Sequence, residues 1–414
     1  MTQARSAAAG ALSGIRVLDL SRVLAGPWAT QTLGDLGAEV IKVERPHTGD
    51  DTRAWGPPYL QDRDGRPTPD SAYYLCANRN KKSIAIDFTR PAGQDLVRQL
   101  ACGCDVLVEN FKVGGLAQYG LDYESLRAVH PGLVYCSITG FGQTGPYAHR
   151  AGYDFLMQGM GGLMSITGHP DGEEGAGPIK VGVALTDILT GLYASTAILA
   201  ALQARERTGE GQWIDLALLD VQVACLANQS MNHLYGRTPG RLGNAHPNTV
   251  PYQDFPTADG HMILAIGNDG QFASFCKAVG KPEWAVDERF RTNDARVRHR
   301  ATLVPLIKQV TVMRNTADWV ALFETVSVPC GPINTLEEVF QDPQVRARGL
   351  EMRMEHHAAG PIPLVASPIR LGGTPVQYTA APPQLGQDTS ALLQDLLGLP
   401  AERIASMKKE GIVQ

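Results

Sequence analysis

Residues 15–44 read IRVLDLSRVLAGPWATQTLGDLGAEVIKVE, and this stretch decides the fold class of the chain. It begins with an apolar run at 15–20 and ends with another at 39–43, each of a length typical of buried strands. Residues 28–36 between them have the pattern of a helix. Two strands joined by a helix at this spacing predict a right-handed βαβ crossover, and therefore two parallel strands in one sheet.

The alternation of strands and helices continues beyond this stretch. Further strands are predicted at 83–86, 105–108 and 133–138, and helices at 93–101 and 123–129. An alternating series of this kind predicts an α/β fold with a mostly parallel sheet, whose ligands bind at the carboxyl ends of the strands.

The second half of the chain has a different organisation. An Ala- and Leu-rich run at 187–205 predicts a long, largely buried helix, and 222–235 predicts another. Beyond a loop at 237–247, a strand is predicted at 260–266 and helices at 271–279, 301–312 and 316–326. A Pro- and Gly-rich connection at 359–386 is expected to lead to a short terminal helix.

A chain of 414 residues is longer than a typical single domain, so two domains are expected. The predicted division is a disordered tail at 1–12, a large domain at 13–220, a linker at 221–244, a small α+β domain at 245–335, and a return linker with a carboxyl-terminal segment at 336–414.

The composition narrows the range of partners. With a formal charge of -5, the chain has no basic surplus for neutralising phosphates, so no nucleic-acid partner is expected. Its apolar runs are interrupted within about ten residues, which predicts no membrane span. The seven cysteines are odd in number and form no C-x-x-C pair, which indicates reduced thiols without a disulfide framework or zinc site. A cytoplasmic location is expected, or the mitochondrial matrix in a eukaryotic source.

Residues 140–145 spell GFGQTG, a literal G-x-G-x-x-G after a predicted strand. A dinucleotide fingerprint must open a helix and precede an acidic residue by about 20 positions. Here Pro146 and Tyr147 follow, and the next acid, Asp154, comes too early. A nicotinamide oxidoreductase is therefore disfavoured, and the glycines are expected to let a loop pass close to a ligand or another backbone segment.

Cationic and amide side chains follow several predicted strands, where an α/β sheet presents its ligands. A ligand with several phosphates would be held by such a set through charge-assisted hydrogen bonds. For Lys81 and Lys82 a solvated turn is an equal alternative, and Phe111 fits either adenine stacking or core packing. The set comprises Arg22, Lys42, Arg45, the run Asn78, Arg79, Asn80, Lys81 and Lys82, and Asn110 with Lys112.

Asp187 directly precedes the long apolar helix predicted at 187–205. The commonest role of an aspartate there is the N-cap, in which its carboxylate accepts bonds from free backbone N–H groups. A helix start also stabilises an ionised carboxylate and keeps it nucleophilic at neutral pH. Gly191 on the first turn would leave space for a bulky ligand. The residues alone leave both roles open.

Many ordered motifs strongly resemble the class III (family III) CoA-transferases, over residues from about 13 to 413. They include LSGIRVLDLSRVLAGP, NRNKKSIAID, DVLVENF, ITGFGQTGPY, RAGYD, GVALTDILTGLYA, RTGEGQWIDLALLD and VPCGPINTLEEVFQDPQV. GDDTRAWGPP and GNAHPNTVPYQ look most like the branch that passes CoA from succinyl-CoA to small dicarboxylates such as glutarate.

The resemblance implies an interlocked homodimer of ring-shaped chains, each with a Rossmann-like large domain, a small domain and a carboxyl-terminal segment that returns to the large one. It implies that Asp187 is the nucleophile, acting through a mixed anhydride and an aspartyl-CoA thioester. No metal or permanently bound cofactor is implied, since CoA enters as part of the substrate. The partners are an acyl-CoA and a small carboxylic acid.

Carried over to this chain, the CoA contacts of the family fall on Arg22, Val23 and Ala25, on Arg45 near the adenosine, and on Asn110 and Phe111. Arg79 and Lys112 are added to this set from the cationic residues above.

Tyr153 and Asp154 match positions that line the formyl-CoA transferase site. The oxalate enzyme of the family has Glu at position 154 and Gln in place of Leu24, which argues against oxalate or formate as substrate. Arg150 and His246 are predicted anchors for the distal carboxylate of a dicarboxylate, because a guanidinium fork and an imidazole both suit that group. A surface role is the alternative for each.

Two other functions fit the same scaffold. An α-methylacyl-CoA racemase needs a histidine and a carboxylate as paired acid and base, and the racemase relatives have a histidine where this chain has Tyr153. A non-catalytic CoA-binding protein would not need to retain Asp187. Both are therefore less favoured than a transferase.

Overall fold

The computed structural model describes residues 10–414, so most of the predicted tail at 1–12 lies outside the described residues. The chain divides into two compact units. One contains the chain up to residue 163 together with 181–235 and 346–414, and the other contains 164–180 and 236–345. The predicted small domain at 245–335 falls within the second unit, to which 164–180 also belongs.

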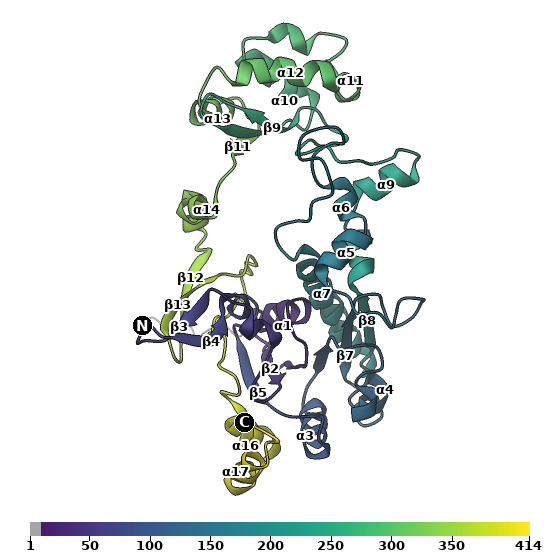
Figure 1. The fold of residues 1–414 in the computed structure, drawn as a ribbon, viewed down its shortest axis with the longest axis vertical. Coiled ribbons are helices and arrows are strands. Elements are labelled where there is room, and N and C mark those ends of the chain that lie inside the picture. The colour runs from purple at the N-terminus through teal and green to yellow at the C-terminus, as the bar shows by residue number, and fades with distance from the viewer. Residues whose placement is uncertain (1–9) are drawn as a thin grey trace. The chain divides into compact units, whose positions relative to one another are not determined.

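The first unit is built on a six-stranded sheet with the order β5-β2-β1-β6-β7-β8, in which every neighbouring pair is parallel (Figure 1). Numbered along the sheet's own strands, this is the 3-2-1-4-5-6 order of a doubly wound fold. The predicted parallel α/β sheet is confirmed. Its strands are β1 (Arg16–Asp19), β2 (Glu39–Glu44), β5 (Lys81–Ala85), β6 (Val106–Glu109), β7 (Val134–Thr139) and β8 (Trp213–Ala217).

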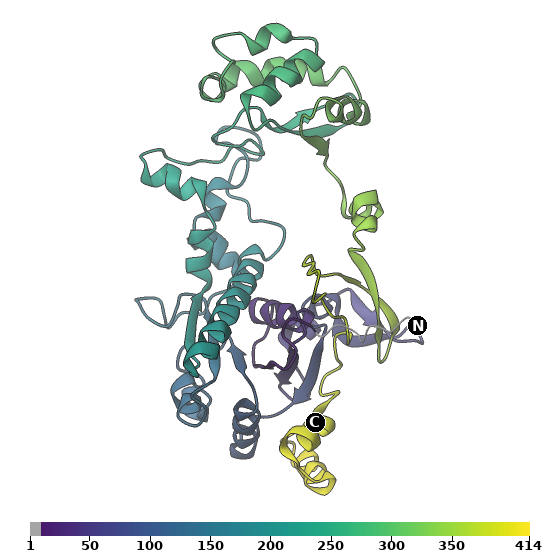
Figure 2. The same ribbon diagram turned by 180° about the vertical axis from the view of Figure 1, so that it is seen from behind.

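Helices cover both faces of this sheet (Figure 2). Successive strand residues point to opposite faces, so the neighbours Val17 and Leu18 on β1 enter different cores. This is why the central strands carry apolar side chains on both faces. One core includes α1 (Ala25–Asp35) and α7 (Leu185–Thr208), and the other includes α3 (Pro91–Cys102), α4 (Tyr123–Arg127), α16 (Thr389–Leu397) and α17 (Ala401–Lys409).

The long helix α7 packs directly on α1. A Cβ at Gly191 would lie 2.7 Å from the backbone oxygen of Ala25, so this glycine permits helix contact. The expectation that Gly191 leaves space for a ligand is wrong. Among residues 10–414, α7 is the one helix long and apolar enough to cross a membrane, and half of its most apolar window is buried inside the protein, as in a core helix.

The rest of the first unit consists of smaller elements. They are η1 (Asp51–Ala54), β3 (Tyr59–Gln61), β4 (Pro67–Ser71), α2 (Ala72–Leu75), η2 (Ala117–Tyr119), α5 (Asp154–Met160), α8 (Leu218–Ala224), α9 (Asn228–Leu234), β12 (Glu351–His356) and β13 (Gly360–Val365). The short helices α6 (Leu163–Ile166) and α15 (Pro343–Ala347) span boundaries between the units in the sequence.

The second unit has an antiparallel sheet of β9 (Tyr252–Pro256), β10 (His261–Ala265) and β11 (Cys330–Pro332). Its apolar core is rich in aromatic residues such as Phe272 and Trp319. The strand and three helices predicted here are confirmed. The helical elements are α10 (Asp269–Ala278), η3 (Pro282–Ala285), α11 (Asn293–Arg298), α12 (Arg300–Thr311), α13 (Thr316–Glu324) and α14 (Leu336–Gln341).

The predicted elements differ from the structure at three places. The single helix expected at 222–235 is two helices, α8 and α9, because the backbone at Ala227 has φ +47°. Strand β8 was not predicted, since it lies at the sheet edge with alternate residues exposed. The chain ends in two helices, α16 and α17, where one was expected.

Candidate active site

Two adjoining cavities open where β1 and β6 end. The strand order reverses between these two strands, so the loops that follow them diverge and leave a crevice. The first cavity, of about 380 Å³, is lined by residues including Arg45 and Phe88. The second, of about 400 Å³, includes Asp187. Arg22 and Phe111 line both, so the two cavities are neighbours.

Asp187 is the third residue of α7 and not its N-cap. The helix begins at Leu185, and the N-cap residue Ala184 has no capping side chain. The expectation that Asp187 caps the helix is therefore wrong. Its side chain instead lies at the wall of the second cavity, and the residue is 7% exposed.

Asp154, the first residue of α5, supplies the missing cap. Its Oδ1 accepts the backbone N–H of Thr186 at 2.7 Å and that of Asp187 at 3.4 Å. Its Oδ2 accepts a bond from Gln158 Nε2 at 2.7 Å. The first N–H groups of a helix lack partners within the helix, and this carboxylate satisfies two of them.

This role differs from the predicted contact of Asp154 with substrate. Asp154 is 8% exposed and does not line either cavity, whereas its neighbour Tyr153, 64% exposed, lines the second one. The carboxylate of Asp154 is therefore hydrogen-bonded to the start of α7, and we infer that it fixes the position of Asp187.

Burial raises the pKa of Asp187 to about 7, and the charge of Asp154 contributes in the same direction. The field of the helix start favours the ionised form, but desolvation outweighs it. Near neutral pH both protonation states of Asp187 are therefore populated, and the expectation that the carboxylate is nucleophilic there stays a prediction.

Tyr73 on α2 is a polar residue that interacts electrostatically with Asp187 and was not predicted from the sequence. Burial, and next the charge of Asp187, raise the pKa of the Tyr73 phenol to about 12, so the phenol stays protonated near neutral pH. Tyr73 lines neither cavity. Its ring packs edge-on against Trp55 at 5.2 Å between centroids. The sequence has no signal for the contact of Tyr73 with Trp55 or for its interaction with Asp187, because the three residues come from separate parts of the chain.

The turn between β1 and α1 contributes Arg22, Val23 and Ala25 to the second cavity. Val23 has φ +71°, a conformation that costs a β-branched residue about 1 kcal/mol or more. Asn110 holds the backbone of Arg22 at both ends: its Oδ1 accepts the Arg22 N–H at 2.9 Å, and its Nδ2 donates to the Arg22 carbonyl at 2.7 Å.

Phe111 packs beside the core, as one of its two interpretations expects, and adenine stacking stays a prediction. Its ring packs edge-on against Phe88 at 5.8 Å, beside the core of the first unit, and also lines both cavities. The guanidinium of Arg22 lies 5.5 Å from the centre of this ring and pairs with Asp51 at 2.7 Å.

Most of the other predicted residues reach a cavity. Lys112 and Arg150 line the second one, and the Arg150 guanidinium lies 4.7 Å from the ring centre of Tyr147. Gly140 of the GFGQTG loop also lines it, and a Cβ at Gly140 would meet the Gly152 Cα at 2.7 Å. The prediction that this loop passes close to another backbone segment is confirmed.

Two cationic residues are buried away from the cavities. Arg79 is bonded to Asp35 at 2.9 and 2.5 Å and lines neither cavity, contrary to its predicted contact with CoA. Lys81 is fully buried against Asp19 at 3.0 Å, so the solvated turn is wrong for this residue. Lys82 is exposed and pairs with Glu39 at 2.7 Å.

His246 belongs to the second unit, where its ring lies 5.2 Å from that of Tyr252. Its role as a carboxylate anchor stays a prediction. Over residues 10–414, no group of three or more His, Cys, Asp or Glu side chains is arranged to hold a metal ion.

Comparison with known proteins identifies the family. The model of CoA-transferase family III matches residues 12–389. The chain is 56% identical to a succinate–glutarate CoA-transferase of Agrobacterium fabrum, over 93% of this chain and 95% of that protein. It is 45% identical to the human succinyl-CoA:glutarate CoA-transferase, over 97% and 90%.

A solved structure agrees with these matches. The crystal structure of a CAIB/BAIF family protein from Brucella suis superposes with a TM-score of 0.81 at 50% identity, covering 94% of this chain and all of the other. The fold, the cavities at its strand ends and the whole-chain matches show that this chain belongs to CoA-transferase family III.

Proposed function

We propose that this CoA-transferase moves CoA from an acyl-CoA donor such as succinyl-CoA to a small dicarboxylate such as glutarate, with Asp187 as the nucleophile. One observation carries the proposal: a buried aspartate lines a cavity that adjoins a second, cation-bearing cavity at the carboxyl edge of the sheet. The substrates named for the relatives support this choice of donor and acceptor.

CoA would occupy both cavities. Its adenosine and phosphate groups would lie in the first cavity, near Arg45 and Phe111, because an arginine and an aromatic ring suit phosphate and adenine. Its pantetheine arm would then pass Arg22 and Val23 into the second cavity. This path ends at Asp187, and Lys112 lies beside it to meet further negative charge.

The chemistry would proceed by carboxyl exchange. An oxygen of ionised Asp187 attacks the donor thioester carbonyl, which forms a mixed anhydride and releases the CoA thiolate. The thiolate attacks the Asp187 carbonyl, which gives an aspartyl-CoA thioester and frees the donor acid. The acceptor carboxylate then attacks this thioester, and the released thiolate attacks the acceptor carbonyl, which restores the Asp187 carboxylate.

Two residues of the second cavity bear on the reaction: Tyr153 favours a nucleophilic Asp187 over a proton-shuttling one, and Arg150 suits a dicarboxylate acceptor. Tyr153, and not a histidine, lies in the cavity with Asp187, so an imidazole partner for a racemase is missing at this position. Arg150 lines the same cavity and is proposed to bind the distal carboxylate of the acceptor, because its fork matches carboxylate geometry.

An apolar surface of the first unit supports a homodimer. Large apolar side chains are exposed on the neighbouring helices α5, α7 and α8, and on α9, which follows α8 in the chain; exposed apolar patches mark protein interfaces. We propose that a second copy of the chain covers them, as in the interlocked dimers of the family, in the cytoplasm or mitochondrial matrix. The exposed apolar side chains on these helices include Leu156, Met160, Leu192, Tyr193, Val223 and Met231.

The pH dependence of CoA transfer should report the pKa of Asp187. The nucleophile must be ionised, so kcat/KM for succinyl-CoA should rise about tenfold per pH unit below pH 7 and level off above it. Initial rates with glutarate from pH 5 to 9 measure this profile. A profile that stays flat down to pH 5, as expected for an aspartate with its ordinary pKa of 3.8, would contradict the buried nucleophile.

Substitution of two exposed arginines should separate the two parts of the site. Arg45→Ala should raise the KM for succinyl-CoA about tenfold and leave the choice of acceptor unchanged, because one charge-assisted contact to CoA is lost.

Arg150→Ala should reduce the preference for glutarate over pentanoate about tenfold, because pentanoate lacks the distal carboxylate. Acceptor competition assays measure the ratio, and an unchanged ratio in Arg150→Ala would remove Arg150 from the acceptor site.

A further inference from the structure

We propose that the buried ion pair of Lys42 and Asp50 is a positioning device that holds the turn after β1 in the shape that binds acyl-CoA. The inference rests on the proposed location of CoA in the two cavities. Arg22, Val23 and Leu24 of this turn line the second cavity, and Arg22 lines the first as well. The shape of this short backbone segment therefore affects both cavities.

The turn has a conformation that its sequence does not favour. Val23 has φ +71°, in the left-handed region that suits glycine, and a β-branched side chain is disfavoured there. Arg22 and Val23 lie between β1 and α1, and their backbone N–H groups bond to side chains and not to a strand or helix partner. Contacts from other parts of the chain must therefore hold it.

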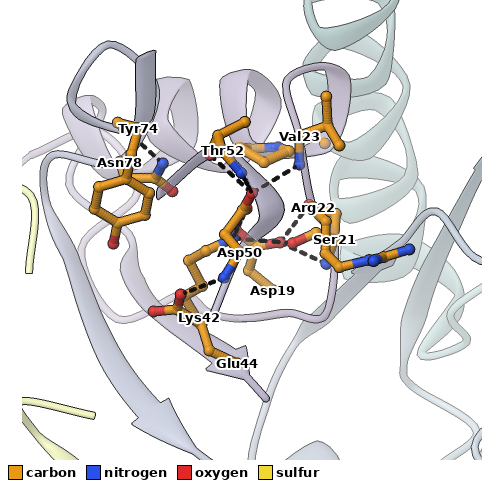
Figure 3. A network of polar contacts seen from close by, with 12 residues as sticks. Asp19, Ser21, Arg22, Val23, Lys42, Glu44, Asp50, Thr52, Tyr74 and Asn78 are labelled. Atoms are coloured by element: carbon orange, nitrogen blue, oxygen red, sulfur yellow. Dashed lines mark hydrogen bonds and ion pairs between the residues drawn. The ribbon is translucent and has the colours of Figure 1, made fainter. Parts of the chain in front are cut away.

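The ion pair supplies these contacts on both sides of Arg22 (Figure 3). Asp50 Oδ1 accepts the backbone N–H of Val23 at 3.2 Å. Lys42 Nζ donates to the carbonyl oxygen of Ser21 at 2.9 Å. The two side chains bond to each other at 2.8 Å, so a single pair bridges the residues before and after Arg22.

The pair itself is held firmly. Both side chains are fully buried, and Asp50 also accepts bonds from the backbone N–H and the hydroxyl of Thr52 at 2.9 and 2.8 Å. Glu44 Oε2 accepts the Asp50 backbone N–H at 2.9 Å. Burial lowers the pKa of Lys42, but the charges of Asp50, Asp19 and Glu44 outweigh this and raise it overall, so the ammonium stays charged.

A buried ion pair contributes little net stability, because the desolvation of both charges offsets their attraction. Its value here is geometric. Together with the Asn110 amide, which bonds to the N–H and carbonyl of Arg22, the pair satisfies four successive backbone groups of the turn through side chains. The turn is thus preorganised before the ligand arrives, and less conformational freedom is lost on binding.

Asp50→Asn tests this role, because it keeps the shape of the side chain but directs an amide N–H group or a neutral oxygen at Lys42. The KM for succinyl-CoA should rise about tenfold, while kcat and the KM for glutarate stay within about twofold. The matched control is Asp35→Asn, which breaks the buried pair with Arg79 in the same unit. Asp35 lines neither cavity, so this control should lower thermal stability without changing the KM for succinyl-CoA.

A double-mutant cycle with Val23→Gly separates positioning from general stability. Glycine adopts φ +71° without strain, so Asp50→Asn should raise the KM for succinyl-CoA much less in the Val23→Gly background than in the parent. If Asp50→Asn does not fold, Lys42→Met with Asp50→Asn gives the same test, because it leaves no unpaired buried charge.

Two results would overturn the inference: equal KM values for Asp50→Asn and Asp35→Asn, or an effect of Asp50→Asn that is independent of Val23→Gly. The location of CoA is tested separately by Arg45→Ala. If Arg45→Ala leaves the KM for succinyl-CoA unchanged, the proposed CoA site is wrong. If it raises that KM and Asp50→Asn does not, only the positioning role is wrong.

Discussion

Asp187→Ala should reduce CoA transfer from succinyl-CoA to glutarate by about 10⁴-fold or more, because among residues 10–414 no other carboxylate lines the second cavity to form the mixed anhydride. The parent protein, incubated with succinyl-CoA and then hydroxylamine, should yield a hydroxamate on the peptide that contains Asp187. Peptide mass spectrometry measures this product, and Asp187→Ala should not form it.

Asp220→Ala is the matched control. Asp220 is also the third residue of a helix, α8, in the same unit, but it is exposed and lines neither cavity. This variant should transfer CoA at the parent rate. If Asp187→Ala were as fast as Asp220→Ala, the nucleophilic mechanism would be wrong.

Ionisation of Asp187, which the reaction requires, should lower the stability of the folded protein. The folded-state pKa of Asp187, about 7, lies above its ordinary value of 3.8, so the folded protein binds more protons than the unfolded chain between these pH values. Stability contributed by Asp187 is therefore lost as the pH rises through this window. Asp187→Asn, which cannot ionise, should melt at a higher temperature than the parent at pH 8, and the difference should shrink towards pH 4.

Asp154→Ala should lower kcat about 10²-fold, because the start of α7 loses its cap and Asp187 shifts from its position. It should also cost about 1–2 kcal/mol of stability, as the loss of a helix cap does. Steady-state kinetics and thermal unfolding measure the two effects.

Asp154→Asn separates the cap from the charge. An asparagine oxygen can still accept the Thr186 N–H, so most of kcat should be retained. The negative charge that helps to raise the pKa of Asp187 is lost, so the midpoint of the pH profile of kcat/KM should fall below 7. If both variants instead raised the KM for glutarate with kcat unchanged, Asp154 would bind the acceptor directly.

The fold class could be predicted because its determinants are local. Strands β1, β2, β6 and β7 are buried on both faces, so each has adjacent apolar residues, and the helices between the strands have their own period. Strand β8 was missed because an edge strand with one exposed face lacks such a run. The single helix expected at 222–235 is interrupted at Ala227, where a positive φ separates α8 from α9.

The candidate site could be predicted only as far as residue type and place after a strand determine it. Arg22, Asn110 and Phe111 reach the cavities because the carboxyl ends of β1 and β6 are neighbours in the sheet. Arg79 and Lys81 follow the same pattern in the sequence, yet they are buried against Asp35 and Asp19. Their partners come from other segments, so no local signal distinguishes them.

The sequence by itself therefore determined the parallel sheet and predicted the edge of that sheet at which ligands would bind, and its family resemblance singled out Asp187 as the proposed nucleophile. Only the tertiary structure decided the state of that aspartate. Its depth in the protein raises its pKa, and Asp154, 32 residues away from Thr186, caps its helix. Hydrophobic periodicity acts over one or two turns of chain, whereas desolvation and buried charge pairing depend on which distant segments come together in space.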